Sequence, residues 1–258
     1  MPNGMNKEVR ILWSGGWDST FRLLQLSQQE DIAIRPMYVR DHARKGMAAE
    51  LAAMRDILPD VRVMAKARVL DVDLYDRGAI LRDFPDEEIS AAYERLAEEF
   101  RLGYQYELFA LLCKGLGVRA ECAVEDAERS KAKTAIDAQC LLVPCEDGQV
   151  GGETRYRVVA KGGNRDAELV FGQLDLAMLG TSKVEAQRVA QELGWMPIMR
   201  KTWFCHTPIK GKPCGTCNPC KDAMNEGMRW RMPPSARLRY RMWLLRSATA
   251  KLNRHRSD

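Results

Sequence analysis

The stretch "VRILWSGGWDST", residues 9–20, decides the expected fold of the N-terminal half. An apolar run that ends at Trp13 is typical of a buried strand, and the residues that follow Asp18 have the pattern of a helix. Between strand and helix, residues 14–16 form a glycine turn. Such a turn points backbone N–H groups outward, and the helix N-terminus adds its positive end. The stretch therefore predicts a phosphate-binding site.

The acid in this turn refines the prediction. Asp18 lies four residues after Ser14, where its carboxylate can orient a magnesium ion bound to phosphates. The turn lacks the lysine of a Walker A loop and the spacing of G-x-G-x-x-G. The alternative is a tight glycine turn in which Asp18 and Ser19 only cap the helix.

Strands and helices are expected to alternate along the first half of the chain, which favours an α/β fold with a doubly wound, mostly parallel sheet. The expected strands are 8–13, 32–39, 61–66 and 117–124, and the expected helices are 19–29, 43–58, 86–101 and 104–116. Short antiparallel strands are expected at 139–144, 154–163 and 168–172. A helix follows at 182–194, with Ser182 as N-cap and Glu185 completing a capping box.

Four of the eight cysteines have the spacing of a metal site, namely Cys205, Cys214, Cys217 and Cys220. Four thiolates in a turn-rich segment suit a tetrahedral structural zinc site. An iron–sulfur cluster is the alternative occupant. The other cysteines, at 113, 122, 140 and 145, have no such spacing, so we expect them to be small apolar core residues.

Composition and charge limit the function classes. No apolar run approaches the roughly 20 residues of a membrane span, and the N-terminus lacks the apolar core of a signal peptide, so we expect a cytoplasmic protein without membrane contact. The net charge is +5, and residues 228–258 hold nine Lys and Arg against one acid. The basic character is therefore confined to the C-terminal tail.

The turn resembles the S-G-G-x-D-S signature of the PP-loop ATP pyrophosphatases, matched at Ser14, Gly15, Gly16, Asp18 and Ser19. The resemblance implies the PP-loop, HUP-like fold and cleavage of ATP between its α and β phosphates, with Mg²⁺ as cofactor. The implied ATP-binding residues are Trp13, Ser14, Gly15, Gly16, Trp17, Asp18, Ser19, Thr20, Tyr38 and Val39. The implied catalytic residues are Asp18, Ser19 and Lys183, although Lys183 also fits a solvated lysine in the first turn of a helix.

Loop and cysteine cluster, in this order, resemble the 7-cyano-7-deazaguanine synthase (QueC) family. The segments "TSKVEAQRVAQELGW" at 181–195 and "TWFCH" at 202–206 are similar to the family's T-K-x-E helix and its approach to the first cysteine. The resemblance covers 9–40 and 180–222 well. It implies an ATP-dependent ligase of queuosine biosynthesis that adenylates a carboxylate, 7-carboxy-7-deazaguanine as first choice. A nitrogen nucleophile then displaces AMP, and Zn²⁺ has a structural role.

Departures from the family concern the acceptor. The segment "RLGYQYE" at 101–107 stands where the family has V-P-G-R-N, and "AVEDAERSKAKT" at 123–134 has no counterpart of the segment that recognises the deazapurine. Two alternatives stay open. The chain is a paralogue that activates a different acceptor, including a macromolecule, or it is a non-catalytic nucleotide-binding subunit of an assembly.

The chain divides into an expected ATP-binding catalytic domain at 1–199, a zinc-binding module at 200–227 and a basic helical tail at 228–258. An apolar stripe runs along the tail helix at Leu238, Met242, Leu245 and Leu252. The stripe favours a homodimer or docking of a protein partner. Arginines interleaved with Trp230, Tyr240 and Trp243 keep nucleic-acid binding as the alternative.

Overall fold

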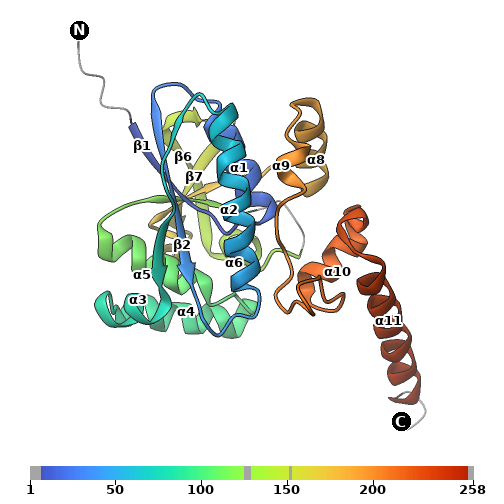
Figure 1. Cartoon of the computed structure of the whole chain (residues 1–258). Coiled ribbons are helices and arrows are strands. Elements are labelled where there is room, and N and C mark those ends of the chain that lie inside the picture. Colours follow the sequence, from blue (N-terminus) through green and yellow to red (C-terminus); the bar gives the residue numbers. More distant parts are fainter. Residues whose placement is uncertain (1–6, 125–128, 151–152, 255–258) are drawn as a thin grey trace.

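The computed structural model describes residues 7–124, 129–150 and 153–254, and its ribbon is shown in Figure 1. The strands are β1 Lys7–Leu12, β2 Ile32–Arg40, β3 Arg68–Val69, β4 Asp73–Asp76, β5 Ala120–Ala123, β6 Cys140–Val150, β7 Glu153–Ala160 and β8 Leu174–Ala177. The first helices are α1 Trp17–Ser27, α2 Met47–Met64, α3 Arg77–Asp83, α4 Glu87–Phe100, α5 Gln105–Leu116 and α6 Lys131–Gln139. The later ones are α7 Asp166–Phe171, α8 Lys183–Glu192, α9 Met196–Met199, α10 Asn218–Asn225, the 3-10 helix η1 Arg229–Arg231, and α11 Pro234–Arg254.

The described strands form one sheet in the order β3-β2-β1-β5-β8-β7-β6, and β4 also pairs with β2. Pairing is parallel from β3 to β8, with β1 in register with β2 from Lys7↔Ile32 to Leu12↔Met37. The hairpin of β6 and β7 joins β8 in the antiparallel sense. The mostly parallel α/β fold expected from the sequence is therefore confirmed.

The strand order reverses beside β1. The chain runs from β1 outward to β2, β3 and β4, and then returns to place β5 on the other side of β1. Ligands of open parallel sheets bind at the carboxyl ends of the strands where such a reversal occurs. The turn that follows β1 lies at this point.

Two apolar layers cover the faces of the sheet because side chains alternate along each strand. On β1, Ile11 and Trp13 pack with α1, α2 and the C-terminal helices, whereas Leu12 packs with α4, α5 and α7 on the other face. Ile11 and Trp13 are almost completely buried. This places the end of β1 between two rigid layers.

Two expected strands are wrong. Residues 61–64 complete α2 and residues 65–66 follow its end; the helix continues through Pro59 because Ile57 and Val61, four positions apart, both lie in the core. Residues 168–172 lie in and just after α7, where Asp166 forms a bidentate ion pair with Arg95 of α4. A run of β-branched and apolar residues fits a buried helix as well as a strand. Tertiary packing therefore determines that both segments contribute to helices.

Other expectations hold, with one exception. The strands expected near 139–144 and 154–163 form the β6–β7 hairpin. Ser182 caps α8 as expected, by accepting a hydrogen bond from the Glu185 N–H. Glu185 does not complete the expected capping box, because its carboxylate accepts hydrogen bonds from Arg188.

The C-terminal segment belongs partly to the body of the molecule. Met228, Met232 and Ala236 are buried in the same core cluster as α1 and α2. Beyond them α11 extends away from the sheet, as Figure 1 shows. In the described part of the chain, no helix combines the length and apolar character that crossing a membrane requires.

Candidate functional site

The turn after β1 requires glycine at its second position. Gly15 has φ +66°, and a Cβ there would lie 3.1 Å from Met54 Cγ and 3.2 Å from the Glu50 carbonyl oxygen. The loop thus packs directly on α2. On its other side, the Trp203 N–H donates to the Gly15 carbonyl over 2.9 Å, so the segment before the cysteine cluster holds the loop in place.

Polar groups converge around the next residue. A Cβ on Gly16 would lie 3.2 Å from Ser14 Oγ and 3.9 Å from Ser19 Oγ, so the two hydroxyls flank it. Ser19 Oγ and Trp17 Nε1 are buried and have no hydrogen-bond partner among the described residues. Buried polar atoms of this kind are expected to bond to a ligand or water.

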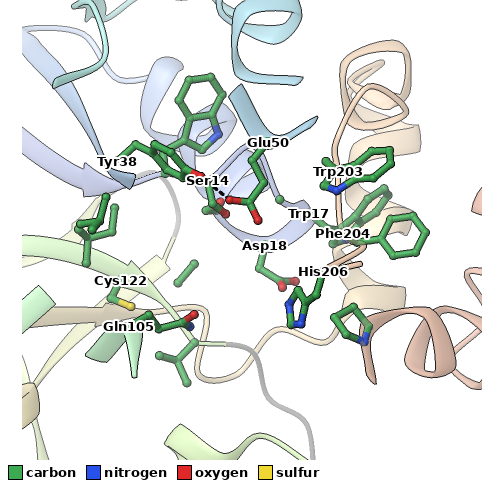
Figure 2. Close-up of a pocket in the computed structure, with 18 of the residues that line it drawn as sticks. Ser14, Trp17, Asp18, Tyr38, Glu50, Gln105, Cys122, Trp203, Phe204 and His206 are labelled. Carbon is green, nitrogen blue, oxygen red and sulfur yellow. Dashed lines mark hydrogen bonds between the residues drawn. The ribbon is translucent and has the colours of Figure 1, made fainter. Parts of the chain in front are cut away.

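The loop forms one wall of a cleft of about 350 Å³, within the size range of small-molecule sites. Figure 2 shows side chains from the loop, from the ends of β2 and β5 and from the segment at 203–206 directed around this space. The sequence-predicted residues that line it are Trp13, Ser14, Gly16, Trp17, Asp18, Ser19, Tyr38, Val39 and Lys183. Gly15 and Thr20 lie behind the wall; the Thr20 hydroxyl accepts a hydrogen bond of 2.9 Å from Trp13 Nε1 in the interior.

Two cations in the cleft were missed by the sequence analysis, Arg44, which pairs with Glu50, and Arg231. Arg231 of η1 lines the cleft with its guanidinium carbon 5.0 Å from the Trp17 ring centroid and 4.4 Å from that of Phe204. Its Nη2 donates to the backbone oxygen and hydroxyl of Thr202 over 2.9 and 2.7 Å. Burial lowers the pKa of Arg231 to about 10, and the nearby Asp18 carboxylate offsets part of that decrease.

The predicted cation Lys183 also lines the cleft, from the start of α8. Its Nζ forms an ion pair of 3.2 Å with Glu226. Asp222 lies beside this pair; burial raises the pKa of its carboxyl group, and the Glu226 charge adds to the increase. The carboxyl groups of Glu226 and Asp222 therefore both interact electrostatically with Lys183.

The end of β2 contributes a tyrosine whose hydroxyl is already engaged. Tyr38 donates to Glu50 Oε2 over 2.5 Å, and Glu50 also accepts from Arg44. Burial raises the pKa of the Tyr38 hydroxyl above its ordinary value, and the Glu50 carboxylate raises it further. At neutral pH Tyr38 is therefore a neutral wall of the cleft.

A second tyrosine–acid pair closes the cleft near α5. Tyr104 donates to Asp41 Oδ2 over 2.6 Å, and the Arg77 guanidinium carbon lies 5.5 Å from its ring centroid. Burial and this hydrogen bond raise the pKa of Tyr104 to about 12. Burial would raise the pKa of Asp41, but hydrogen bonds from Tyr104 and the Ala43 N–H outweigh it and lower that pKa.

The four spaced cysteines meet in one cluster that can hold a metal ion such as zinc, because their sulfur atoms all lie within 4.8 Å of one another. The Sγ–Sγ distances are 3.8 Å for Cys214 and Cys220 and 3.9 Å for Cys205 and Cys217. Four sulfurs at the usual Zn–S length define a tetrahedron with edges of about 3.8 Å. The donor set therefore fits zinc.

Backbone groups favour a thiolate in this cluster. The Thr216 and Cys217 N–H groups each lie 3.3 Å from Cys214 Sγ, and the Thr207 hydroxyl donates to the same sulfur. Burial would raise the pKa of Cys214, but these hydrogen bonds outweigh it and lower the pKa. Residues 213–217, called the cysteine turn from here on, therefore favour the binding of a metal cation.

The cysteine turn is also locked to α11. Gly215 has φ +89°, and a Cβ there would lie only 2.3 Å from the Ala236 carbonyl oxygen. Arg239 donates from Nε to the Cys214 carbonyl and from Nη2 to the Pro213 carbonyl, over 2.6 and 2.8 Å. Helix α11 therefore starts on the cysteine turn.

No family model matches this chain. A search of the curated proteins also returns no match. Any functional assignment therefore rests on the loop, the cleft and the cysteine cluster.

The remaining cysteines are buried as expected, at 113, 122, 140 and 145. Cys122 lies at the end of β5 and contributes to the cleft wall opposite Trp203, as Figure 2 shows. Burial raises the pKa of its thiol to about 12, so it is present as a neutral thiol. His206 lines the cleft beside the cysteine cluster.

Proposed function

We propose that this chain is an ATP-dependent ligase of the 7-cyano-7-deazaguanine synthase type, which adenylates a carboxylate and transfers the acyl group to a nitrogen nucleophile. The observation that carries the proposal is the position of the glycine turn. It follows β1 where the strand order reverses, opens α1, and lines a cleft of nucleotide size with Ser14, Asp18 and Ser19.

In the proposed reaction, the turn and the N-terminus of α1 bind the β and γ phosphates of ATP. A carboxylate oxygen of the acceptor attacks the α phosphorus, and pyrophosphate leaves. Ammonia or another amine attacks the acyl carbon and displaces AMP. The first product is an amide, so a nitrile requires a second activation that removes the amide oxygen.

Asp18 and Ser19 are the groups proposed to hold magnesium, which when bound neutralises charge on the leaving pyrophosphate. Both line the cleft at the first turn of α1. A carboxylate and a hydroxyl are oxygen donors of the type that Mg²⁺ prefers. The adenine is proposed to lie near Tyr38 and Val39, at the end of β2.

The four cysteines are proposed to hold zinc in a structural role. Four protein thiolates leave no coordination position for substrate. Trp203, two residues before the first of them, binds the Gly15 carbonyl of the loop. The cluster would therefore fix a segment that supports the ATP site.

A product assay tests the proposal. Purified protein is incubated with ATP, Mg²⁺ and ammonium, with and without 7-carboxy-7-deazaguanine, and products are resolved by mass. We expect the deazapurine amide and nitrile together with AMP. AMP and pyrophosphate without a deazapurine product would indicate a different acceptor. Bound, intact ATP would favour the non-catalytic subunit, and absence of ATP binding would refute the proposal.

A further inference from the structure

Arg231 is a cation that neutral groups hold in the cleft. The Trp17 and Phe204 rings lie on the guanidinium at 5.0 and 4.4 Å, and Thr202 accepts both hydrogen bonds from Nη2. Within the described residues, no acidic side chain lies in ion-pair distance of this guanidinium. Arg231 is half-buried, and a charge withdrawn from part of its water without such a partner is costly, so a site of this kind favours an anionic ligand.

The guanidinium stands beside the first turn of α1. Trp17, on which it stacks, is the first residue of that helix, and its buried Nε1 has no hydrogen-bond partner among the described residues. The buried Ser19 Oγ, in the same turn, likewise has none. Two side-chain donors and a cation thus border the cleft at the positive end of a helix.

Lys183 does not have this character, although it lines the same cleft. Its ammonium group is compensated by Glu226 at 3.2 Å, and Asp222 lies close by. Arg44, a third cation that lines the cleft, is likewise paired with a carboxylate, that of Glu50. Among the described cations of the cleft, Arg231 alone faces aromatic rings instead of a carboxylate at salt-bridge distance.

We infer that Arg231, Trp17 Nε1 and Ser19 Oγ form a phosphate subsite that binds the polyphosphate of the nucleotide, with Arg231 supplying the cation from the C-terminal segment. The inference rests on the proposed use of ATP. The Asp18 carboxylate acts on the Arg231 guanidinium through its charge. If Asp18 held a magnesium ion, phosphate oxygens would supply the counter-charge of the guanidinium in its place.

The test compares Arg231→Gln with Arg229→Gln. Arg229 belongs to the same 3-10 helix but is exposed and lies outside the cleft, so both variants lose one positive charge. The probes are α,β-methylene-ATP with Mg²⁺ and inorganic tripolyphosphate, measured by calorimetry. A charge-assisted hydrogen bond corresponds to roughly ten- to a hundredfold in affinity. We expect a loss of this size for both probes in Arg231→Gln and almost none in Arg229→Gln.

A measurement on the wild-type protein does not depend on the folding of a variant. Phenylglyoxal modifies arginine guanidinium groups, and peptide mass analysis reports each site. We expect tripolyphosphate to slow modification of Arg231 and leave Arg229 unchanged. Tripolyphosphate affinity equal in wild type and Arg231→Gln, or modification of Arg231 at the same rate with and without tripolyphosphate, would overturn the assignment alone. If wild-type protein binds neither probe, the proposed use of ATP is wrong and the subsite fails with it.

Discussion

Asp18 occupies the second position of α1, directly after the glycine turn, and its charge acts on Arg231. Its carboxylate lines the cleft where the proposed magnesium would bind. The charge of this one side chain, more than its shape, is what the proposed chemistry uses.

Replacing Asp18 by Asn should keep the fold and suppress turnover. Removal of one preorganised electrostatic contact typically lowers the rate by roughly 10²–10³. The measurement is pyrophosphate release with ATP and the carboxylate substrate, alongside the melting temperature. Release at the wild-type rate would contradict the role assigned to Asp18.

The sequence predicts the part of this site that comes from the glycine turn and β2, but not the part that comes from the C-terminal segment. The loop residues and Tyr38 follow consecutive strands, so their positions at one edge of the sheet could be expected from the alternation of strands and helices. Arg231 could not, because it reaches the cleft only through contacts with Thr202 and Phe204. In the sequence it is one of nine basic residues between 228 and 258, and nothing there distinguishes it from Arg229.

Helix α1 is tied to the centre of the sheet by a buried ion pair. Arg22 Nε donates to Glu121 Oε2 of β5 over 2.7 Å, and both side chains are almost fully buried. Arg155 of β7 lies 3.4 Å from the other oxygen of Glu121. One carboxylate therefore links a helix, a parallel strand and the antiparallel hairpin.

We expect Glu121→Gln to destabilise the protein by about 3–5 kcal/mol, because it leaves the buried Arg22 guanidinium without its counter-charge and removes the nearer acid of Arg155, which keeps Asp175 at 3.8 Å. The free energy of unfolding would be measured in urea. The control is Asp137→Asn, which breaks the exposed Lys133–Asp137 pair of α6 and should cost less than about 1 kcal/mol. A similar decrease in the free energy of unfolding for both variants would show that burial does not determine how much an ion pair stabilises this protein.

At the scale of secondary structure, the expected strand at 61–66 is wrong because the local sequence pattern favours a strand whereas tertiary packing favours a helix. The run "VRVMAKARVL" at 61–70 has the composition of a strand, yet its first residues continue a helix that contains Pro59. The helix nevertheless continues because Val61 fills the core one turn after Ile57. The expected strand at 61–66 is absent, and the short strand β3, Arg68–Val69, forms just after it.

The join between the cysteine turn and α11 depends on a glycine. In Gly215→Ala, the new Cβ would meet the Ala236 carbonyl oxygen, and alanine would be held at φ +89°. Strain of this backbone region costs about 1–3 kcal/mol before any clash is counted. We expect a lower melting temperature and less than one metal ion per chain by elemental analysis. Gly117→Ala, at φ +63° in open space, isolates the strain from the clash.

At the scale of the whole molecule, α11 presents one covered and one exposed side. Ala236 and Tyr240 are buried against the body, whereas Leu238, Met242 and Leu245 are exposed. Leu252 lies among residues whose side chains the structure does not describe. The helix contains no acidic residue. Homodimerisation or partner docking through this helix stays a prediction.

The double substitution Leu238→Glu, Leu245→Glu tests self-association. If the stripe is the dimer contact, the mass in solution should fall from two chains to one, because charged residues disfavour burial at the contact. Light scattering gives the mass, and Leu193→Glu, an exposed leucine on the C-cap of α8, is the control. A wild-type protein that already has the mass of one chain would contradict the prediction.

The contact of Gly215 with α11 has a thermodynamic consequence. The cysteine turn holds the start of α11, and Arg231, three residues before that helix begins at Pro234, lines the cleft. Coupling between two binding sites is reciprocal. If a metal ion bound to the cysteine cluster increases the affinity for the nucleotide by some factor, the bound nucleotide must increase the affinity for the metal by the same factor. We expect a nucleotide analogue to raise the chelator concentration that removes half of the metal. With Arg231→Gln this protection should disappear, so each ligand would report whether the other is present.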